Sequence, residues 1–158
     1  IVMPCNTAHY WHQDIQKKIK IPLLSMPREV FNYTKKTCKK NTKIGILCTE
    51  ATLKTKVYHQ YFDKKYDFIS PTKNLQTSSV NKSIKYVKMG KVKEAEKALR
   101  PAVNQLIKKK CKKIILGCTE LPIALFAYKS FKKAKDSKLF IDPNLLLAQV
   151  CMRKYKNN

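Results

Sequence analysis

The sequence predicts an α/β fold built from two parallel-sheet domains. Short apolar runs alternate with segments of helical periodicity along most of the 158 residues, a pattern typical of βαβ units. Two of these runs end alike, each in one cysteine followed by small polar residues, at Cys5 and at Cys118. This echo favours two pseudo-symmetric domains, each with a thiol at the carboxyl end of a strand, where α/β proteins bind ligands.

The first 41 residues predict two strand–helix pairs. Trp11, Ile15 and Ile19 recur at helical spacing after the first apolar run. A second apolar run and a second helical segment follow. The expected elements are a strand over 1–5, a helix over 8–19, a strand over 21–26 and a helix over 28–39.

The central part predicts three strands and three helices. The run Lys-Ile-Gly-Ile-Leu-Cys over 43–48 is apolar and sharply bounded, as a buried parallel strand is. Gly90 separates two helical segments, and the second has Ala95, Leu99 and Val103 in its apolar stripe. The expected elements are a strand over 43–48, a helix over 52–65 with Val57, Tyr61 and Phe62 inward, a strand over 66–70, helices over 74–87 and 93–110, and a strand over 113–117.

A late strand and a final helix complete the pattern. The apolar run 139–142 predicts the strand, and Pro143 suits the first turn of the helix. The charged end of the second helix near 41–42 and the charged loop 132–138 are candidate boundaries. We therefore predict a second domain over 42–137, with 1–41 and 138–158 forming the remnant of a first domain. The two thiols would then face each other across a cleft between the two domains.

Two thiols across a cleft suit proton transfer at both faces of one carbon. One thiolate removes a proton, while the other thiol returns a proton to the opposite face. The ordinary thiol pKa of about 8.5 needs only modest lowering, which a helix N-terminus supplies. The residues alone leave a second interpretation open, in which Cys5 and Cys118 are buried structural cysteines.

The residues around the cysteines resemble a known family. Cys5-Asn6-Thr7-Ala8-His9 and Gly117-Cys118-Thr119-Glu120 together are similar to the paired motifs of the aspartate/glutamate racemases. The resemblance implies a cofactor-independent amino-acid racemase with Cys5 and Cys118 as its catalytic acid/base residues. Thr119-Glu120 and His9 resemble the aspartate branch, which implies L- and D-aspartate as substrates.

The same resemblance implies a set of substrate-binding residues. The segment Cys48-Thr49-Glu50-Ala51-Thr52 looks like a family loop that binds the α-carboxylate, and Lys88 looks like a lysine that holds the side-chain carboxylate. N-capping by Thr49 or Thr52 and a dipole-favoured carboxylate at Glu120 are the alternatives. The expected substrate-binding residues are Asn6, Thr7, Thr49, Thr52, Lys88, Thr119 and Glu120.

The resemblance also implies a longer chain. Members of the family have a glycine-rich strand and further substrate-binding residues before the Cys-Asn-Thr motif. We therefore expect an N-terminally truncated member whose first domain is incomplete. Hydantoin racemase or another racemase on the same scaffold is an alternative activity.

The net charge of +24 suggests a different function, the binding of polyanions such as nucleic acids. The basic residues number 34, but only Arg28, Arg100 and Arg153 are arginines, and base readout favours the arginine fork. The lysines are dispersed over all the predicted helices. We expect no specific nucleic-acid partner, although a non-catalytic lysine-rich binding module stays the rival hypothesis.

Several other classes are disfavoured. No run approaches the roughly 20 apolar residues of a membrane span, so no membrane partner is expected. The six cysteines form no Cys-x-x-Cys pair, which predicts no metal, no disulfide framework and a cytoplasmic location. The expected partner is a small acidic amino acid, and a homodimer stays open.

Overall fold

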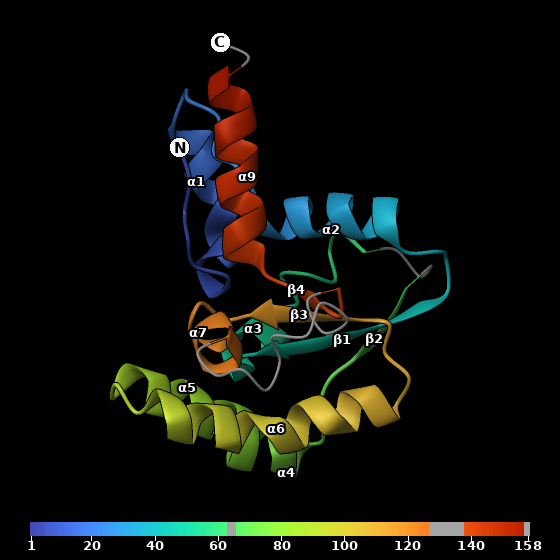
Figure 1. Cartoon of the computed structure of the whole chain (residues 1–158). Helices are drawn as coiled ribbons and strands as arrows, with labels where there is room; N and C mark the ends of the chain where they lie inside the picture. Colours follow the sequence, from blue (N-terminus) through green and yellow to red (C-terminus); the bar gives the residue numbers. More distant parts are fainter. Residues whose placement is uncertain (63–65, 127–137, 157–158) are drawn as a thin grey trace.

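A parallel sheet of four strands forms the middle of the molecule (Figure 1). The computed structural model describes residues 1–62, 66–126 and 138–156. The strands follow the spatial order β2-β1-β3-β4 and all pair in parallel. Their bounds are β1 Thr42–Cys48, β2 Tyr66–Ile69, β3 Lys113–Gly117 and β4 Phe140–Ile141. The predicted α/β class is thereby confirmed.

Side chains alternate between the two faces of this sheet, and each face is covered by helices. Ile44, Ile46 and Ile115 pack on one face with Val30 of α2 (Met26–Thr37) and Leu146 of α9 (Pro143–Lys156). Leu47, Ile114 and Leu116 pack on the other face. That face is covered by α5 (Lys82–Lys88), α6 (Val92–Lys108) and α7 (Glu120–Phe126). Strands buried on both faces explain the nearly continuous apolar runs in the sequence.

The predicted strands over 1–5 and 21–26 are wrong. Only Val2 and Leu24 form a bridge, which is parallel and contains the bond from Leu24 N–H to the Ile1 carbonyl. One further bond joins the N-terminal ammonium group of Ile1 to the Pro22 carbonyl. Pro4 and Pro22 lack the N–H that a ladder needs. The chain turns at Cys5 and continues as a 3₁₀ helix, η1 (Thr7–Trp11), and helix α1 (His12–Lys18).

The predicted helix over 52–65 is much shorter than expected. Helix α3 spans Glu50–Lys54, and Lys56 then adopts a left-handed backbone with φ of 53°, which ends the helix. The segment continues in turns as far as Phe62, and residues 63–65 lie outside the described residues. Val57 and Phe62 are buried as predicted, whereas Tyr61 is only half-buried.

The predicted helix over 74–87 is confirmed, but it is not regular throughout. It comprises α4 (Lys73–Leu75), a π-helical turn η2 (Gln76–Asn81) and α5. Gly90, at a φ of 73°, separates α5 from α6 as the sequence predicted.

The C-terminal strand joins the sheet of the central part. Ile114 and Ile115 pair with Phe140 and Ile141, so β4 extends the sheet that β1–β3 form. Asp142 then caps α9, since its Oδ1 accepts hydrogen bonds from the N–H groups of Asn144 at 2.9 Å and Leu145 at 3.3 Å. The division into domains over 42–137 and the two flanking parts stays a prediction, and residues 132–137 of the proposed boundary loop lie outside the described residues.

Candidate active site

The carboxyl ends of β1 and β3 lie next to each other and carry candidate residues from two motifs. Cys48 pairs with Gly117, so Thr49 and Cys118 leave the sheet from neighbouring strand ends. A Cβ atom at Gly117 would lie 2.9 Å from Cβ of Cys48 and 3.3 Å from the ring of Tyr58. Glycine before Cys118 therefore allows the two strand ends to approach this closely.

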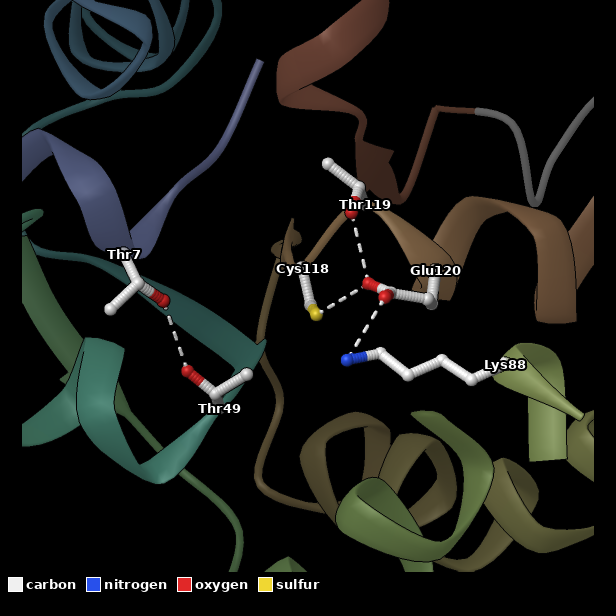
Figure 2. A network of polar contacts seen from close by, with 6 residues as sticks. All are labelled: Thr7, Thr49, Lys88, Cys118, Thr119 and Glu120. Carbon is white, nitrogen blue, oxygen red and sulfur yellow. Dashed lines mark hydrogen bonds and ion pairs between the residues drawn. The ribbon is translucent and has the colours of Figure 1, made fainter. Parts of the chain in front are cut away.

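The first group of candidate residues centres on Glu120 (Figure 2). Its Oε2 accepts hydrogen bonds of 2.9 Å from the Cys118 thiol and from the Thr119 hydroxyl. Nζ of Lys88 lies 3.6 Å from the other carboxylate oxygen. The Lys88 side chain is 66% exposed and that of Glu120 is 19% exposed, so the ion pair spans the surface and a partly buried site.

The Cys118 thiol is protonated in this arrangement. Burial raises its pKa to about 12, and the hydrogen bond to Glu120 and the negative charge of that carboxylate act in the same direction. Lys88 acts in the opposite direction and lowers it. The prediction that a helix N-terminus brings this pKa below its ordinary value is therefore wrong for Cys118. The backbone N–H of Glu120, where α7 begins, does lower the pKa. Burial and the Glu120 carboxylate outweigh that contribution.

Glu120 stays ionised beside this thiol. Burial raises the pKa of its carboxyl group, but the hydrogen bonds from Cys118 and Thr119 and the charge of Lys88 outweigh burial and leave the pKa below its ordinary value. The carboxylate can therefore serve as a hydrogen-bond acceptor throughout the neutral range.

The second group consists of three threonines from two segments. The hydroxyl of Thr7 lies 3.2 Å from that of Thr49 and 2.7 Å from that of Thr52, and the latter two are 3.0 Å apart. Thr49 also caps α3 by accepting a hydrogen bond from the Thr52 N–H at 3.2 Å, so the expected N-cap is present. The contacts join the Cys-Asn-Thr motif to the start of α3, just after β1 (Figure 2).

His9 holds the backbone next to Cys5. Its Nδ1–H donates to the Cys5 carbonyl at 2.8 Å, and its Nε2 accepts from the Met26 N–H at 3.0 Å. These two partners require the neutral ring with the proton on Nδ1. Burial lowers the pKa of His9 below its ordinary value, which keeps the ring neutral. His9 is thus a structural residue that fixes the Cys5-Asn6-Thr7 segment (the Cys5 loop) against the start of α2.

Tyr58 lies at the site although it was not among the predicted residues. This tyrosine is fully buried, and its hydroxyl donates a hydrogen bond to Oδ1 of Asn6. Asn6 itself is 3% exposed, and its Nδ2 has no hydrogen-bond partner among the residues that the structure describes. A tyrosine in a predicted helical segment is expected to be a core residue. Nothing in the sequence pattern therefore marks Tyr58, rather than Tyr61, as a residue of the site.

The structure thus brings the predicted residues together in two groups, one around Glu120 and one around Thr7. Asn6 connects to both groups, since it precedes Thr7 and is bonded to Tyr58, whose ring lies against Gly117. Cys5 is exposed and Cys118 is 8% exposed. No hydrogen bond joins these two thiols within the described part of the chain, so a direct pairing of Cys5 with Cys118 stays a prediction.

Comparison with protein families assigns the chain. A family model described as Asp/Glu/Hydantoin racemase matches residues 1–151. The chain belongs to this racemase family. The family resemblance predicted from the two cysteine motifs is confirmed.

Individual members of the racemase family align over most of this chain. It is 28% identical to a glutamate racemase of Carboxydothermus hydrogenoformans over 100% of this chain and 57% of the relative. It is 26% identical to the broad specificity amino-acid racemase RacX of Bacillus subtilis over 79% of this chain and 53% of the relative. The chain therefore spans little more than half the length of these two racemases.

Solved racemase structures have the same fold. The aspartate racemase of Picrophilus torridus superposes with a TM-score of 0.73 at 27% identity, covering 94% of this chain and 61% of that structure. A putative Asp/Glu racemase from Yersinia pestis gives a TM-score of 0.76 at 25% identity, with 95% and 63% covered. The fold of the racemase family extends over nearly all of the present chain.

Two structural findings bear on other classes of function. None of the described residues forms a group of three or more histidine, cysteine, aspartate or glutamate side chains suited to a metal ion. Among the described helices, none combines the length and the apolar character needed to cross a membrane.

Proposed function

We propose that the protein interconverts the enantiomers of an acidic amino acid, aspartate first among them, by moving protons at Cα with Cys5 and Cys118. The observation that carries this proposal is the buried, protonated Cys118 thiol next to Glu120, Thr119 and Lys88. Membership of the racemase family supports the reaction class.

The two polar groups suit the two carboxylates of aspartate. The clustered hydroxyls of Thr7, Thr49 and Thr52 can donate to an α-carboxylate and stabilise the negative charge that develops when the Cα proton leaves. Lys88 is mostly exposed, so its flexible side chain can turn from Glu120 toward the side-chain carboxylate of the substrate. A compact cation of this kind selects an acidic side chain.

The protonation state of Cys118 gives that thiol its starting role. Cys118 holds its proton because burial and Glu120 raise its pKa to about 12, so it acts first as the proton donor. The base that removes the Cα proton is then the other thiol of the proposed pair, the exposed Cys5. In the reverse direction the roles exchange, and Lys88 favours the thiolate form of Cys118.

The test is racemisation in deuterated water. The chain is incubated with L-aspartate, and D-aspartate and deuterium at Cα are measured by chiral chromatography and NMR. We expect both products, and we expect Cys5→Ala and Cys118→Ala each to abolish D-aspartate formation. The buried Cys111→Ala is the matched control, since Cys111 lies in the core beside Gly45. A folded chain that exchanges no Cα proton contradicts the proposal.

Substrate choice is tested in the same assay. L-glutamate and a 5-substituted hydantoin are compared with L-aspartate, because the family includes all three kinds of substrate by name. We expect the highest kcat/KM with aspartate. A preference for the hydantoin, which lacks carboxylates, would contradict the assigned role of Lys88.

A further inference from the structure

Tyr58 contacts the segments that carry both cysteine motifs. Its hydroxyl donates to Asn6, the neighbour of Cys5. Its ring lies 3.3 Å from the position that a Cβ of Gly117 would take, and Gly117 precedes Cys118. Tyr58 itself lies on the segment that follows α3, the short helix that carries Thr49 and Thr52 at its start. One buried side chain therefore connects three segments that are far apart in the sequence.

Asn6 depends on this contact. Its side chain is buried, and within the described residues the only hydrogen-bond partner of that side chain is Tyr58, since Nδ2 has none there. Removing the hydrogen-bond partner of a buried amide group destabilises the folded state, because the amide then stays buried without a partner. Loss of the Tyr58 hydroxyl would therefore release Asn6 from its position and loosen the backbone around it.

The Tyr58 hydroxyl is also a dependable donor. Burial raises its pKa well above the ordinary value, and the nearby Cys48, Asp142 and Cys118 act in the same direction. The hydroxyl thus keeps its proton over the whole working range of pH. A phenolate, which could not donate to Asn6, does not form.

We infer that Tyr58 is a positioning residue, which holds the Cys5-Asn6-Thr7 loop against the end of β3 and so sets the geometry of the two thiols. As a role in catalysis this inference rests on the proposed racemase function. As a mechanical link between the two motifs it does not depend on that function, so the two can be tested separately.

The experiment compares Tyr58→Phe with Tyr61→Phe. The second variant is a matched control, because the half-buried Tyr61 hydroxyl accepts a hydrogen bond of 3.0 Å from Ser25 and is bonded to neither motif. Both variants keep the ring and lose one hydrogen bond. Amide hydrogen exchange of the 5–8 segment is measured by mass spectrometry, with α5 as an internal reference.

We expect exchange over 5–8 to be about tenfold faster in Tyr58→Phe, the factor that corresponds to one lost hydrogen bond, and unchanged in Tyr61→Phe. Equal exchange over 5–8 in Tyr58→Phe and wild type would overturn the inference, whether or not the chain racemises aspartate. Faster exchange in both variants alike would also overturn it.

The catalytic part of the experiment measures the effect of Tyr58→Phe on kcat and on KM separately. Misplaced acid/base groups lower kcat by about tenfold or more while KM changes little, whereas a loss of stability alone lowers the melting temperature and leaves kcat unchanged. We expect the Tyr58→Phe effect on kcat to disappear in an Asn6→Ala background, because both substitutions break the same bond. Independent, additive effects of the two substitutions would contradict positioning through Asn6. If wild type itself does not racemise, the proposed function fails and the exchange result still decides the link.

Discussion

The thiol of Cys118 donates a hydrogen bond of 2.9 Å to the carboxylate of Glu120, two residues later in the chain. A carboxylate that accepts from a buried thiol stabilises the protonated form. The site therefore holds one of its two proposed acid/base groups as an acid before any ligand arrives.

Glu120→Gln should lower the pKa of Cys118. The substitution removes the negative charge, which is one cause of the value of about 12. Burial remains, so we expect a partial fall that stays above the ordinary thiol value of about 8.5. The pH dependence of alkylation at Cys118, followed by peptide mass spectrometry, measures it. Glu50→Gln is the control, since Glu50 is bonded to Asn81, and a profile identical to wild type in Glu120→Gln would refute the contribution of the carboxylate.

Lys88→Gln should weaken binding of aspartate without weakening the fold. Lys88 is exposed, and we expect the free energy of unfolding to stay within about 0.5 kcal/mol of wild type. The loss of a charge-assisted contact should raise KM for aspartate about tenfold. Lys85→Gln on the same helix is the matched control. Equal KM values in the two variants would show that Lys88 does not contact the substrate.

The stability of the protein should fall as the pH drops through the range in which His9 takes up a proton. Burial lowers the pKa of His9 in the folded state, so the unfolded chain binds that proton more readily. Its contribution is complete above the unfolded pKa of about 6.5 and is lost as the pH falls from there toward the folded pKa. Urea unfolding across this range measures the dependence.

His9→Gln should flatten that pH dependence, because the titrating ring is gone. His59 also has a lowered pKa, through burial and the charge of Lys56, but it lies outside the Cys5 loop and packs on Phe68. We expect His59→Gln to keep the His9 part of the pH dependence. The same slope in wild type and in His9→Gln would contradict the assignment.

Gly117→Ala should destabilise the protein by about 1–3 kcal/mol through overpacking. The new Cβ would lie 2.9 Å from Cβ of Cys48, which belongs to a packed strand and cannot move aside. Gly90→Ala is an instructive comparison, because nothing lies within 4 Å there and only its positive φ of 73° opposes the change. The shift in urea midpoint measures both. A Gly117→Ala midpoint equal to wild type would mean that the strand ends can separate.

Most of the regular elements of the sheet region follow from the sequence. β1 and β3 are apolar on both faces and bounded by polar residues, and α6 carries a long apolar stripe. Local pattern and tertiary packing agree there. The first 26 residues are different, because Val2 and Leu24 are apolar enough for strands yet form only a single bridge, and the ladder that would make them strands depends on neighbours that local sequence does not specify.

The candidate site is predictable in composition and less so in geometry. The two cysteine motifs indicated Asn6, Thr7, Thr119 and Glu120, and the structure places these residues in two polar groups. The raised pKa of Cys118 was not predicted, because it depends on the side-chain torsions that bring Glu120 back onto the thiol. Tyr58 was missed because its role depends on contacts with residues 52 and 59 positions away in the chain.

The two proposed catalytic cysteines are held with different rigidity, because the segment before Cys5 forms only the single bridge at Val2. Cys118 follows β3, which pairs with β1 and with β4. Moving Cys118 therefore requires hydrogen bonds between these strands to break. The Cys5 loop is held mainly by side chains, those of His9, Thr7 and Tyr58, which can open one at a time. Local opening at low free-energy cost is therefore expected at Cys5 and not at Cys118. The side of the site that carries Cys5 can therefore adjust to a ligand, while the side that carries Cys118 stays fixed.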